Sequence, residues 1–318
     1  MTDTSRTSRT SDIDILVSEV GPRDGLQSVD RTMPTAVKNR WITALAGAGL
    51  REIEVGSFVS PKRLPQLADT ADVVAAAITI ADLNVLALVP NLIGASNAIA
   101  AGARNLTMPI SASRAHSQRN IGMTPEQALG EVSKIAKLRA DAPGLHLEVG
   151  ISTAFGCTVQ GPVDEDWVIE LALSAVRNGA DSVGLSDTTG YAQPTQIRRL
   201  FTRLRAELGD RAGGAHLHNT RGQGLANVVA ALDVGVTTFD SSQAGLGGCP
   251  YAPGASGNIV TEDLVFLLES MGLRTGVDID GLIAARAIIT EGLPGEDLYG
   301  HIPDAGLPKG FRYAGVAA

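Results

Sequence analysis

The 318-residue sequence has little cysteine, no surplus of basic residues and no long apolar run, and these shortages exclude several classes of protein. Two cysteines cannot form a disulfide framework in a chain of this length, so we expect a reducing compartment and a cytoplasmic location. The sequence lacks any run of about 18 uncharged apolar residues, and it therefore predicts no membrane span. Lys and Arg number 26 against 34 Asp and Glu, which argues against a nucleic-acid partner.

Apolar residues make up 44% of the chain and charged residues 19%, a balance that is too apolar for a disordered protein. The exception is the first twelve residues, MTDTSRTSRTSD, which are polar and lack apolar periodicity. We expect residues 1–12 to form a disordered tail rather than a targeting peptide, because the stretch is short, contains acids and has no apolar face.

From residue 13 onward, short β-branched runs alternate with Ala/Leu-rich stretches of helical period. The predicted strands are 13–20, 52–56, 84–89, 105–110, 146–151, 182–186, 214–218 and 237–240. The predicted helices are 37–48, 64–78, 96–102, 125–139, 165–178, 194–208, 225–233 and 261–270. Eight βα repeats without a linker predict one (β/α)8 TIM barrel over residues 13–275. A doubly wound sheet is disfavoured because the turn after the first strand, GPRDGLQ, is not a GxGxxG fingerprint.

Residues 276–318 are expected to form a short C-terminal helical extension, with one helix near 280–290.

In a barrel of this type, the active site is built at the carboxyl ends of the strands. The polar residues that fall at or just after predicted strand ends are therefore the candidates for chemistry: Arg23, Asp24, Glu52, Glu54, Asp187, His216, His218, Cys249 and Asn258.

The clearest signal is the pair His216 and His218, because residues two apart on a strand project to the same face. With Asp24 in reach, two imidazoles at a strand end favour a metal site over two ordinary histidines. A mixed set of nitrogen and oxygen donors suits Mg²⁺ or Mn²⁺, while Zn²⁺ and Co²⁺ stay open. The other three histidines have no such neighbours, and we interpret them as structural or exposed.

Cys249 lies in a glycine-rich segment that offers few apolar contacts to bury a thiol. We therefore prefer thiol chemistry there, either acid/base or nucleophilic, to the alternative of a small buried hydrophobe. Cys157 is interpreted as structural, since nothing else in its loop suggests chemistry.

Charged residues beside these positions have two interpretations each. Arg23 either pairs locally with Asp24 or stabilises negative charge on a substrate. Glu54 and Asp187 are either ordinary acids at strand ends or functional residues. In the second case, either of them could be the catalytic base or a residue that supports a metal ligand. Glu52 is the more structural of the acids on its strand.

Four segments together resemble one family: EVGPRDGLQ at 19–27, IEVGSFVSPK at 53–62, HLHNTRGQGLAN at 216–227 and AGLGGCPYAPGASGN at 244–258. The sequence resembles the hydroxymethylglutaryl-CoA lyases, which are metal-dependent TIM-barrel enzymes, over about residues 14–272. The segment around Cys249 is the most specific element. The Claisen-condensing synthases and aldolases that share this barrel are the alternative, in which a 2-keto acid is the partner substrate.

The resemblance implies a retro-Claisen cleavage of 3-hydroxy-3-methylglutaryl-CoA, or a close 3-hydroxyacyl-CoA, to acetyl-CoA and a keto acid. It implies that Asp24, His216, His218 and Asn258 bind the divalent cation. Arg23 would bind substrate and stabilise the enolate, Cys249 would transfer a proton, and Glu54 and Asp187 would be active-site acids. It also suggests a homodimer.

Three residues depart from the pattern of these lyases, namely Asn219, Arg221 and Gln243. We expect all three to surround the metal site and to affect which 3-hydroxyacyl-CoA is cleaved. For the CoA phosphates, an acidic enzyme needs local cations, and we assign Lys62, with Arg63, to this role.

Overall fold

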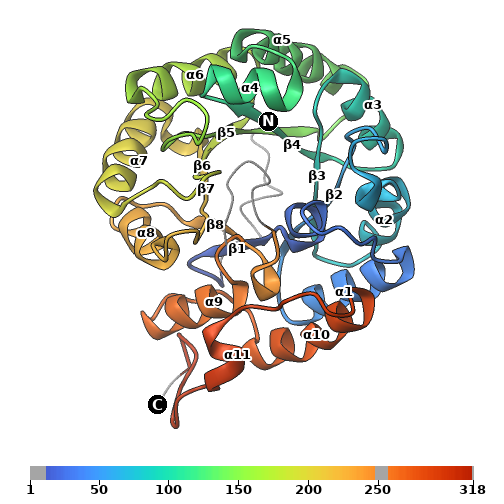
Figure 1. The fold of residues 1–318 in the computed structure, drawn as a ribbon, viewed down its shortest axis with the longest axis vertical. Coiled ribbons are helices and arrows are strands. Elements are labelled where there is room, and N and C mark those ends of the chain that lie inside the picture. Colours follow the sequence, from blue (N-terminus) through green and yellow to red (C-terminus); the bar gives the residue numbers. More distant parts are fainter. Residues whose placement is uncertain (1–11, 248–256, 317–318) are drawn as a thin grey trace.

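The computed structural model describes residues 12–247 and 257–316. Eight parallel strands close into a barrel in which each strand pairs with its sequence neighbours and β8 pairs with β1 (Figure 1). The strands are β1 (Leu16–Glu19), β2 (Glu52–Ser57), β3 (Asn84–Leu88), β4 (Asn105–Ser111), β5 (His146–Ser152), β6 (Ser182–Ser186), β7 (Ala212–His216) and β8 (Thr238–Ser241). The predicted (β/α)8 fold is confirmed.

Helices lie outside the barrel because parallel strands must be joined by crossovers that cover the sheet. They are α1 (Thr35–Gly47), α2 (Thr70–Ala77), α3 (Leu92–Ala100), α4 (Arg114–Ile121), α5 (Pro125–Ala136), α6 (Glu165–Arg177), α7 (Pro194–Leu208), α8 (Gly224–Leu232), α9 (Thr261–Ser270), α10 (Ile279–Gly292) and α11 (His301–Ala305). The limits of α7 and α9 match the prediction. The predicted helix 64–78 is divided into a 3₁₀ turn, Pro65–Leu67, and α2.

The two faces of the strands differ in chemistry. On β2, Ile53 and Val55 belong to the apolar core between strands and helices, while Glu52 and Glu54 line a cavity inside the barrel. β5 repeats the pattern, since Leu147, Val149 and Ile151 are buried in the core and the residues between them face inward. This is the two-residue period of a strand. The core is therefore a ring, and the barrel interior contains acids beside apolar residues such as Leu86.

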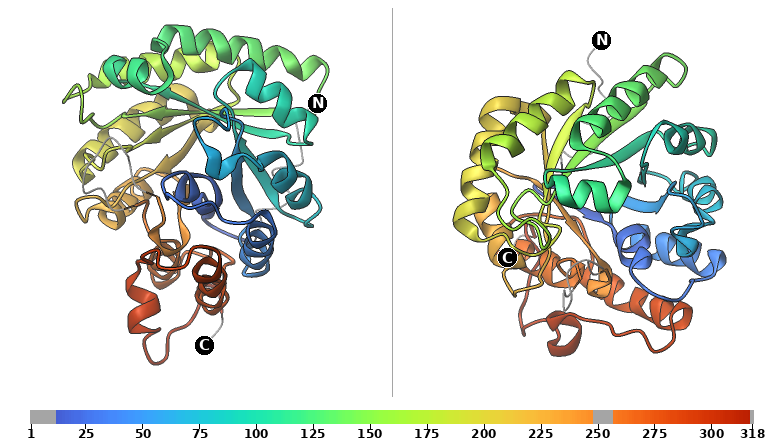
Figure 2. Two further views of the ribbon diagram at one scale, coloured as in Figure 1. Left: turned by 45° about the vertical axis from the view of Figure 1, so that its right-hand side comes forward. Right: turned by 45° about the horizontal axis from the view of Figure 1, so that its top comes forward.

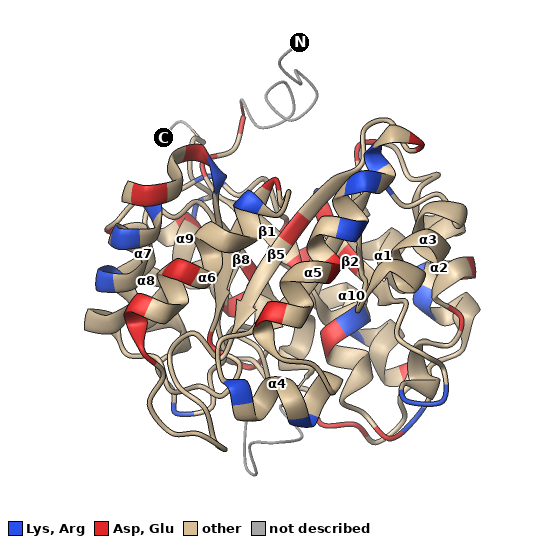
Figure 3. Cartoon of the chain, turned by 90° about the horizontal axis from the view of Figure 1, so that it is seen from above, with Lys and Arg blue, Asp and Glu red and all other residues tan. Residues whose placement is uncertain are grey.

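Acidic and basic residues are interspersed over the outer helices (Figure 3), and ion pairs join neighbouring helices. Arg199 on α7 pairs with Glu165 on α6, and Arg198 pairs with Asp233 at the end of α8. Exposed pairs of this kind each contribute about 0–1 kcal/mol, so the apolar ring is the main source of stability.

The chain after β8 forms a group of three helices, α9 to α11, on one side of the barrel (Figures 1 and 2). α9 completes the ring, and α10 packs on α1. The predicted tail is outside the described residues except for Asp12, which pairs with Arg51. Among the described residues, no helix has both the length and the apolar character to cross a membrane.

Candidate metal centre and active site

A cavity of about 1160 Å³ opens at the carboxyl ends of the strands and continues into the barrel. Its walls combine acids, histidines and arginines with apolar residues such as Leu86, Leu88 and Met123. The polar groups that matter below are Arg23, Asp24, Gln27, Glu54, Arg63, Thr107, His116, Arg119, His216, His218 and Asp240.

Arg23 and Asp24 are held by a single π-helical turn, Gly21–Gly25, directly after β1. The carbonyl of Val20 accepts the N–H groups of both residues, at 3.0 and 2.7 Å. π-helical turns are rare in proteins, and those that do occur are often found at functional sites. Because the turn follows β1 directly, it places the side chains of Arg23 and Asp24 on the cavity wall at the carboxyl end of the strand.

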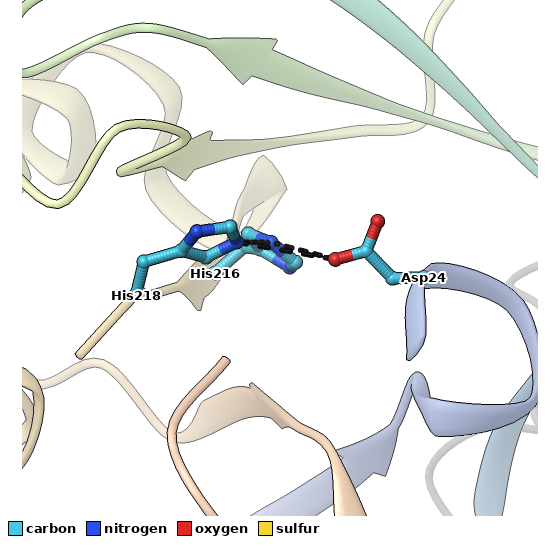
Figure 4. Close-up of side chains that lie close together, drawn as sticks. All are labelled: Asp24, His216 and His218. Atoms are coloured by element: carbon cyan, nitrogen blue, oxygen red, sulfur yellow. Dashed lines mark hydrogen bonds and ion pairs between the residues drawn. The ribbon is translucent and has the colours of Figure 1, made fainter. Parts of the chain in front are cut away.

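His216 is the last residue of β7, and His218 follows it in a bridge with Asn258. The two Nε2 atoms face each other at 3.1 Å (Figure 4). Asp24 Oδ2 lies 3.7 Å from the Nε2 of His216 and 3.9 Å from that of His218. The convergence predicted from the HLH pattern is present, although His218 lies beyond the strand rather than on it.

Asn258 completes the cluster. Its Nδ2 donates to Asp24 Oδ2 at 2.7 Å, and its Oδ1 is buried with no hydrogen-bond partner among the described residues. The oxygen and nitrogen of an amide are assigned from such contacts. If the amide is turned over, its oxygen faces the carboxylate of Asp24, and this arrangement requires a cation between them.

The donor atoms fit a divalent ion. With ligand bonds of about 2.0–2.2 Å, adjacent ligand atoms lie about 3 Å apart and opposite ones about 4 Å apart. The three separations of the donor atoms, 3.1, 3.7 and 3.9 Å, are short enough for one ion to contact all three residues. Asp24, His216 and His218 would therefore hold the ion, with Asn258 as a further oxygen donor.

The protonation states of Asp24 and His218 also suit metal binding. Burial opposes the charge on Asp24, but the Arg23 guanidinium and the imidazoles outweigh it and hold the pKa of Asp24 at about 2. Burial, with His216 next to it, lowers the pKa of His218 to about 4. The carboxylate is thus ionised and His218 is neutral at neutral pH, which are the forms that bind metals.

Arg23 is fixed by carboxylates on both sides. Its Nε donates to Glu54 Oε2 and its Nη1 to Asp24 Oδ1, and Thr107 donates to the other oxygen of Glu54. Burial disfavours the guanidinium charge, but Asp24 and Glu54 outweigh it and raise the pKa of Arg23. The result is a permanent cation on the cavity wall beside the metal cluster.

Asp240 is a site residue that the sequence analysis missed. Its Oδ2 lies 2.9 Å from His216 Nδ1, and its side chain is 30% exposed to the cavity. Burial lowers the pKa of His216, but Asp240 outweighs this and raises it. Its position at the end of the eighth predicted strand was the available signal. Gln27, which donates to Asp24 Oδ1, was similarly visible in the motif.

Asp187 lies behind the wall rather than on it. It is buried and is absent from the described cavity lining, which includes Ser186 and Thr188 on either side. Its Oδ1 accepts from the Tyr191 N–H at 2.8 Å, and its Oδ2 has no partner among the described residues. Burial raises the pKa of Asp187 to about 6.

The candidates for CoA binding and thiol chemistry have different outcomes. Lys62 is exposed and is absent from the described lining, whereas its neighbour Arg63 lines the cavity. Cys249 lies outside the described residues. Cys157 is buried in a tight turn and accepts the Val159 N–H, which supports a structural role.

His116 and Glu52 were both interpreted as structural, and both line the cavity. His116 comes from α4, which the sequence analysis did not predict.

The three departures from the lyase pattern do not all surround the metal. Asn219 accepts the N–H of Gly224 at the start of α8. Arg221 lies outside the cavity lining and stacks on Tyr191, with 4.5 Å between the guanidinium carbon and the ring centre. Gln243 is fully buried and contacts α1 and α10, so its expected position at the metal site was wrong.

The fold and the cluster define a (β/α)8-barrel enzyme with a candidate divalent-metal centre at the carboxyl ends of its strands. Residues 14–289 match the family described as HMGL-like, and the chain belongs to this family. It is 39% identical over 279 residues to the mitochondrial hydroxymethylglutaryl-CoA lyase of Bos taurus, covering 88% of this chain and 86% of the relative. It is 39% identical over 277 residues to the hydroxymethylglutaryl-CoA lyase YngG of Bacillus subtilis, covering 87% and 92%.

The solved structures agree. An HMG-CoA lyase from Acinetobacter baumannii, in complex with coenzyme A and 3-methylmalate, superposes with a TM-score of 0.88 at 38% identity and covers 95% of this chain and 98% of that one. The HMG-CoA lyase of Bacillus subtilis gives a TM-score of 0.87 at 37% identity, with 92% and 97% covered. The family resemblance inferred from four motifs is confirmed.

Proposed function

We propose that this protein is a hydroxymethylglutaryl-CoA lyase, which cleaves 3-hydroxy-3-methylglutaryl-CoA to acetyl-CoA and acetoacetate. The observation that carries the proposal is the convergence of Asp24, His216 and His218 beside Arg23 on one cavity wall. The named relatives, which match the chain along most of its length, support the substrate.

Asp24, His216, His218 and Asn258 are the proposed ligands of a divalent cation, with Mg²⁺ or Mn²⁺ preferred because carboxylate and amide oxygens are hard donors. When bound, such an ion supplies Lewis acidity that lowers the pKa of the 3-hydroxyl of the substrate. Asp240 orients His216 through its hydrogen bond to Nδ1, as is common behind metal-bound histidines.

The cleavage moves one proton and breaks one carbon–carbon bond. The 3-hydroxyl gives its proton to a base, for which we propose the cavity-facing carboxylate of Asp240, whose side chain is 30% exposed. The bond between C2 and C3 breaks, the hydroxyl oxygen becomes the ketone of acetoacetate, and the electron pair forms the enolate of acetyl-CoA. Asp187 is retained as a positioning residue that acts on His216 through its charge.

Arg23 stabilises the enolate oxygen by its fixed charge, and Glu54 orients the guanidinium. The enolate then takes a proton, for which we propose Cys249, and the resulting thiolate recovers a proton from the protonated base or from solvent, so that the net change is the transfer of one proton. A thiol in that role needs no nucleophilic step.

The CoA part of the substrate needs cations for its phosphates. Arg63 and Arg119 on the cavity wall are suited to this role, with Lys62 beside Arg63. The homodimer and the cytoplasmic location remain predictions.

The test is a panel of CoA esters with product identification by mass spectrometry. 3-Hydroxy-3-methylglutaryl-CoA is expected to yield acetyl-CoA and acetoacetate, and citramalyl-CoA and longer 3-substituted glutaryl-CoA esters test the width of the site. His218→Ala is expected to abolish cleavage, while His301→Ala, an exposed histidine of α11, is expected to preserve it. If no ester is cleaved and acetyl-CoA condenses with a 2-keto acid, the protein is a synthase instead.

A further inference from the structure

A short buried turn, Gln243–Gly245, follows β8 and leads toward the metal ligand Asn258. Ala244 in this turn has φ 59° and ψ 16°, and it is completely buried. A residue other than glycine is strained in the left-handed region and persists there only where surrounding contacts fix it. Those contacts come from the C-terminal part of the chain.

Ala244 is held at both of its backbone groups. Its N–H donates to Glu262 Oε2 on α9 at 3.1 Å, and its carbonyl accepts the N–H of Tyr299 at 2.9 Å. Arg286 on α10 joins the two partners. Its Nη1 donates to Glu262 Oε1 at 2.8 Å and to the Tyr299 carbonyl at 3.0 Å. Glu262 is fully buried and the Arg286 side chain is 14% exposed, so water reaches this ion pair only from the arginine side.

Gln243 forms a second link to the same helix. Its Oε1 accepts from the Trp41 indole on α1, and its Nε2 donates to the Leu282 carbonyl on α10 at 2.5 Å. An apolar side chain at this position could form neither of these hydrogen bonds. The turn is therefore connected to α10 through two independent side chains.

The residues next to the turn pack against both oxygen ligands, and Gly245 of the turn packs against Gly257, the neighbour of Asn258. A Cβ on Gly247 would lie 3.0 Å from Asn258 Nδ2 and 3.1 Å from the Asp24 carbonyl. A Cβ on Gly257 would lie 1.9 Å from the Gly245 carbonyl and 2.2 Å from that of Gly247. Close packing of this kind transmits a shift of the turn directly to Asp24 and Asn258.

We propose that the C-terminal extension positions the oxygen ligands of the metal centre, with Arg286 and Gln243 as the positioning residues. Neither residue lines the cavity in the described part of the chain. The inference rests on the metal site of the proposed function, and it concerns the preorganisation of that site rather than the cleavage step. Removal of either link leaves every ligand in the chain but loosens two of them.

The experiment measures Mn²⁺ affinity of the metal-free full chain by calorimetric titration, with folding checked by near-UV circular dichroism. Arg286→Ala and Gln243→Met are each expected to weaken Mn²⁺ binding about tenfold, as supporting residues around metal ligands do. Arg40→Ala is the matched control, because it removes an exposed ion pair between α1 and Glu291 on the same helix α10. The control is expected to change the affinity less than twofold.

Arg286→Ala leaves Glu262 buried without its partner, so Gln243→Met decides the question if the first variant does not fold. Wild-type Mn²⁺ affinity in folded Gln243→Met overturns the proposal. Equal weakening in Arg40→Ala also overturns it, because the effect would then belong to general loosening of the extension. Failure of the wild-type chain to bind Mn²⁺ removes the metal site itself, whereas binding that no variant affects removes this inference alone.

Discussion

Glu19, at the end of β1, offers a quantitative test of the electrostatics inside the fold. The side chain is completely buried, and burial raises the pKa of Glu19 from 4.5 to about 8. Opposing this, Oε1 accepts the N–H groups of Gly21 and Gln243, and Oε2 accepts the Thr261 hydroxyl. The folded chain therefore keeps a proton that the unfolded chain releases above pH 4.5.

Because the folded state binds the extra proton, a rise in pH favours unfolding. The contribution of Glu19 to stability is fully present below pH 4.5 and is lost as the pH rises through 8. Between pH 5.5 and 8.0, the two pKa values correspond to a loss of about 3 kcal/mol of unfolding free energy. The loss is calculated at roughly 1.4 kcal/mol per pKa unit. It is a large share of the unfolding free energy of a folded domain, which is typically about 5–15 kcal/mol.

The assay is urea denaturation of the metal-free chain at pH 5.5 and 8.0, for the wild type and for Glu19→Gln. The amide mimics the protonated acid, since its oxygen can accept both N–H groups and its NH₂ can donate to Thr261. We expect the variant to lose about 3 kcal/mol less than the wild type over this pH interval. Glu291→Gln, an exposed acid on α10, serves as the control and is expected to follow the wild type. Identical pH slopes for the wild type and Glu19→Gln would refute the reasoning.

Four further outcomes test the proposed site. Arg23→Met is expected to lower kcat by about 10²–10³ with Mn²⁺ affinity retained, as measured by steady-state kinetics and calorimetry. Asp240→Asn is expected to weaken Mn²⁺ binding about 10–100-fold, and unchanged affinity would contradict its hydrogen bond to His216. Treatment with EDTA is expected to abolish turnover, and added Mg²⁺ or Mn²⁺ to restore it; activity that survives exhaustive chelation would exclude the metal. Cys249→Ser is expected to lower kcat by orders of magnitude while metal stays bound, and near-wild-type kinetics would remove the thiol from the mechanism.

Most of the strands were predictable because they are short runs of apolar or β-branched residues, and eight βα repeats in a row define the barrel. The exception is β7, Ala212–His216, whose sequence AGGAH has few such residues, and the predicted range 214–218 begins and ends two residues too late. The helix α4 was not predictable, since RAHSQRNI has only two apolar residues, Ala115 and Ile121, and Arg114 pairs with Glu126 on the exposed surface. Its stability comes from the Ser113 cap and from tertiary contacts such as His116 with Ser111, which no local pattern reports. The wall of the cavity formed by α4 was therefore missed.

The ligand cluster was predictable for a different reason. Strand ends of a barrel meet at one edge, so Asp24 and His218 are brought together by topology alone. Gln243 shows the limit of that argument. It lies close in sequence to the Cys249 segment, but its side chain turns toward Trp41 and Leu282, and only the packing of α10 determines this direction.

Residues that face the apolar core alternate with residues that face the cavity along β2 and β5, so substitutions at the two sets of positions have different effects. Outward residues such as Val55 and Val149 carry the apolar ring, so substitution there is felt as lost stability. Inward residues such as Glu52 and Glu148 line the cavity, where substitution changes the shape and charge offered to a substrate and leaves the packing of the apolar ring intact. A library restricted to inward positions should therefore yield many folded variants with altered acyl-group preference, and the same library moved one residue along each strand should yield few.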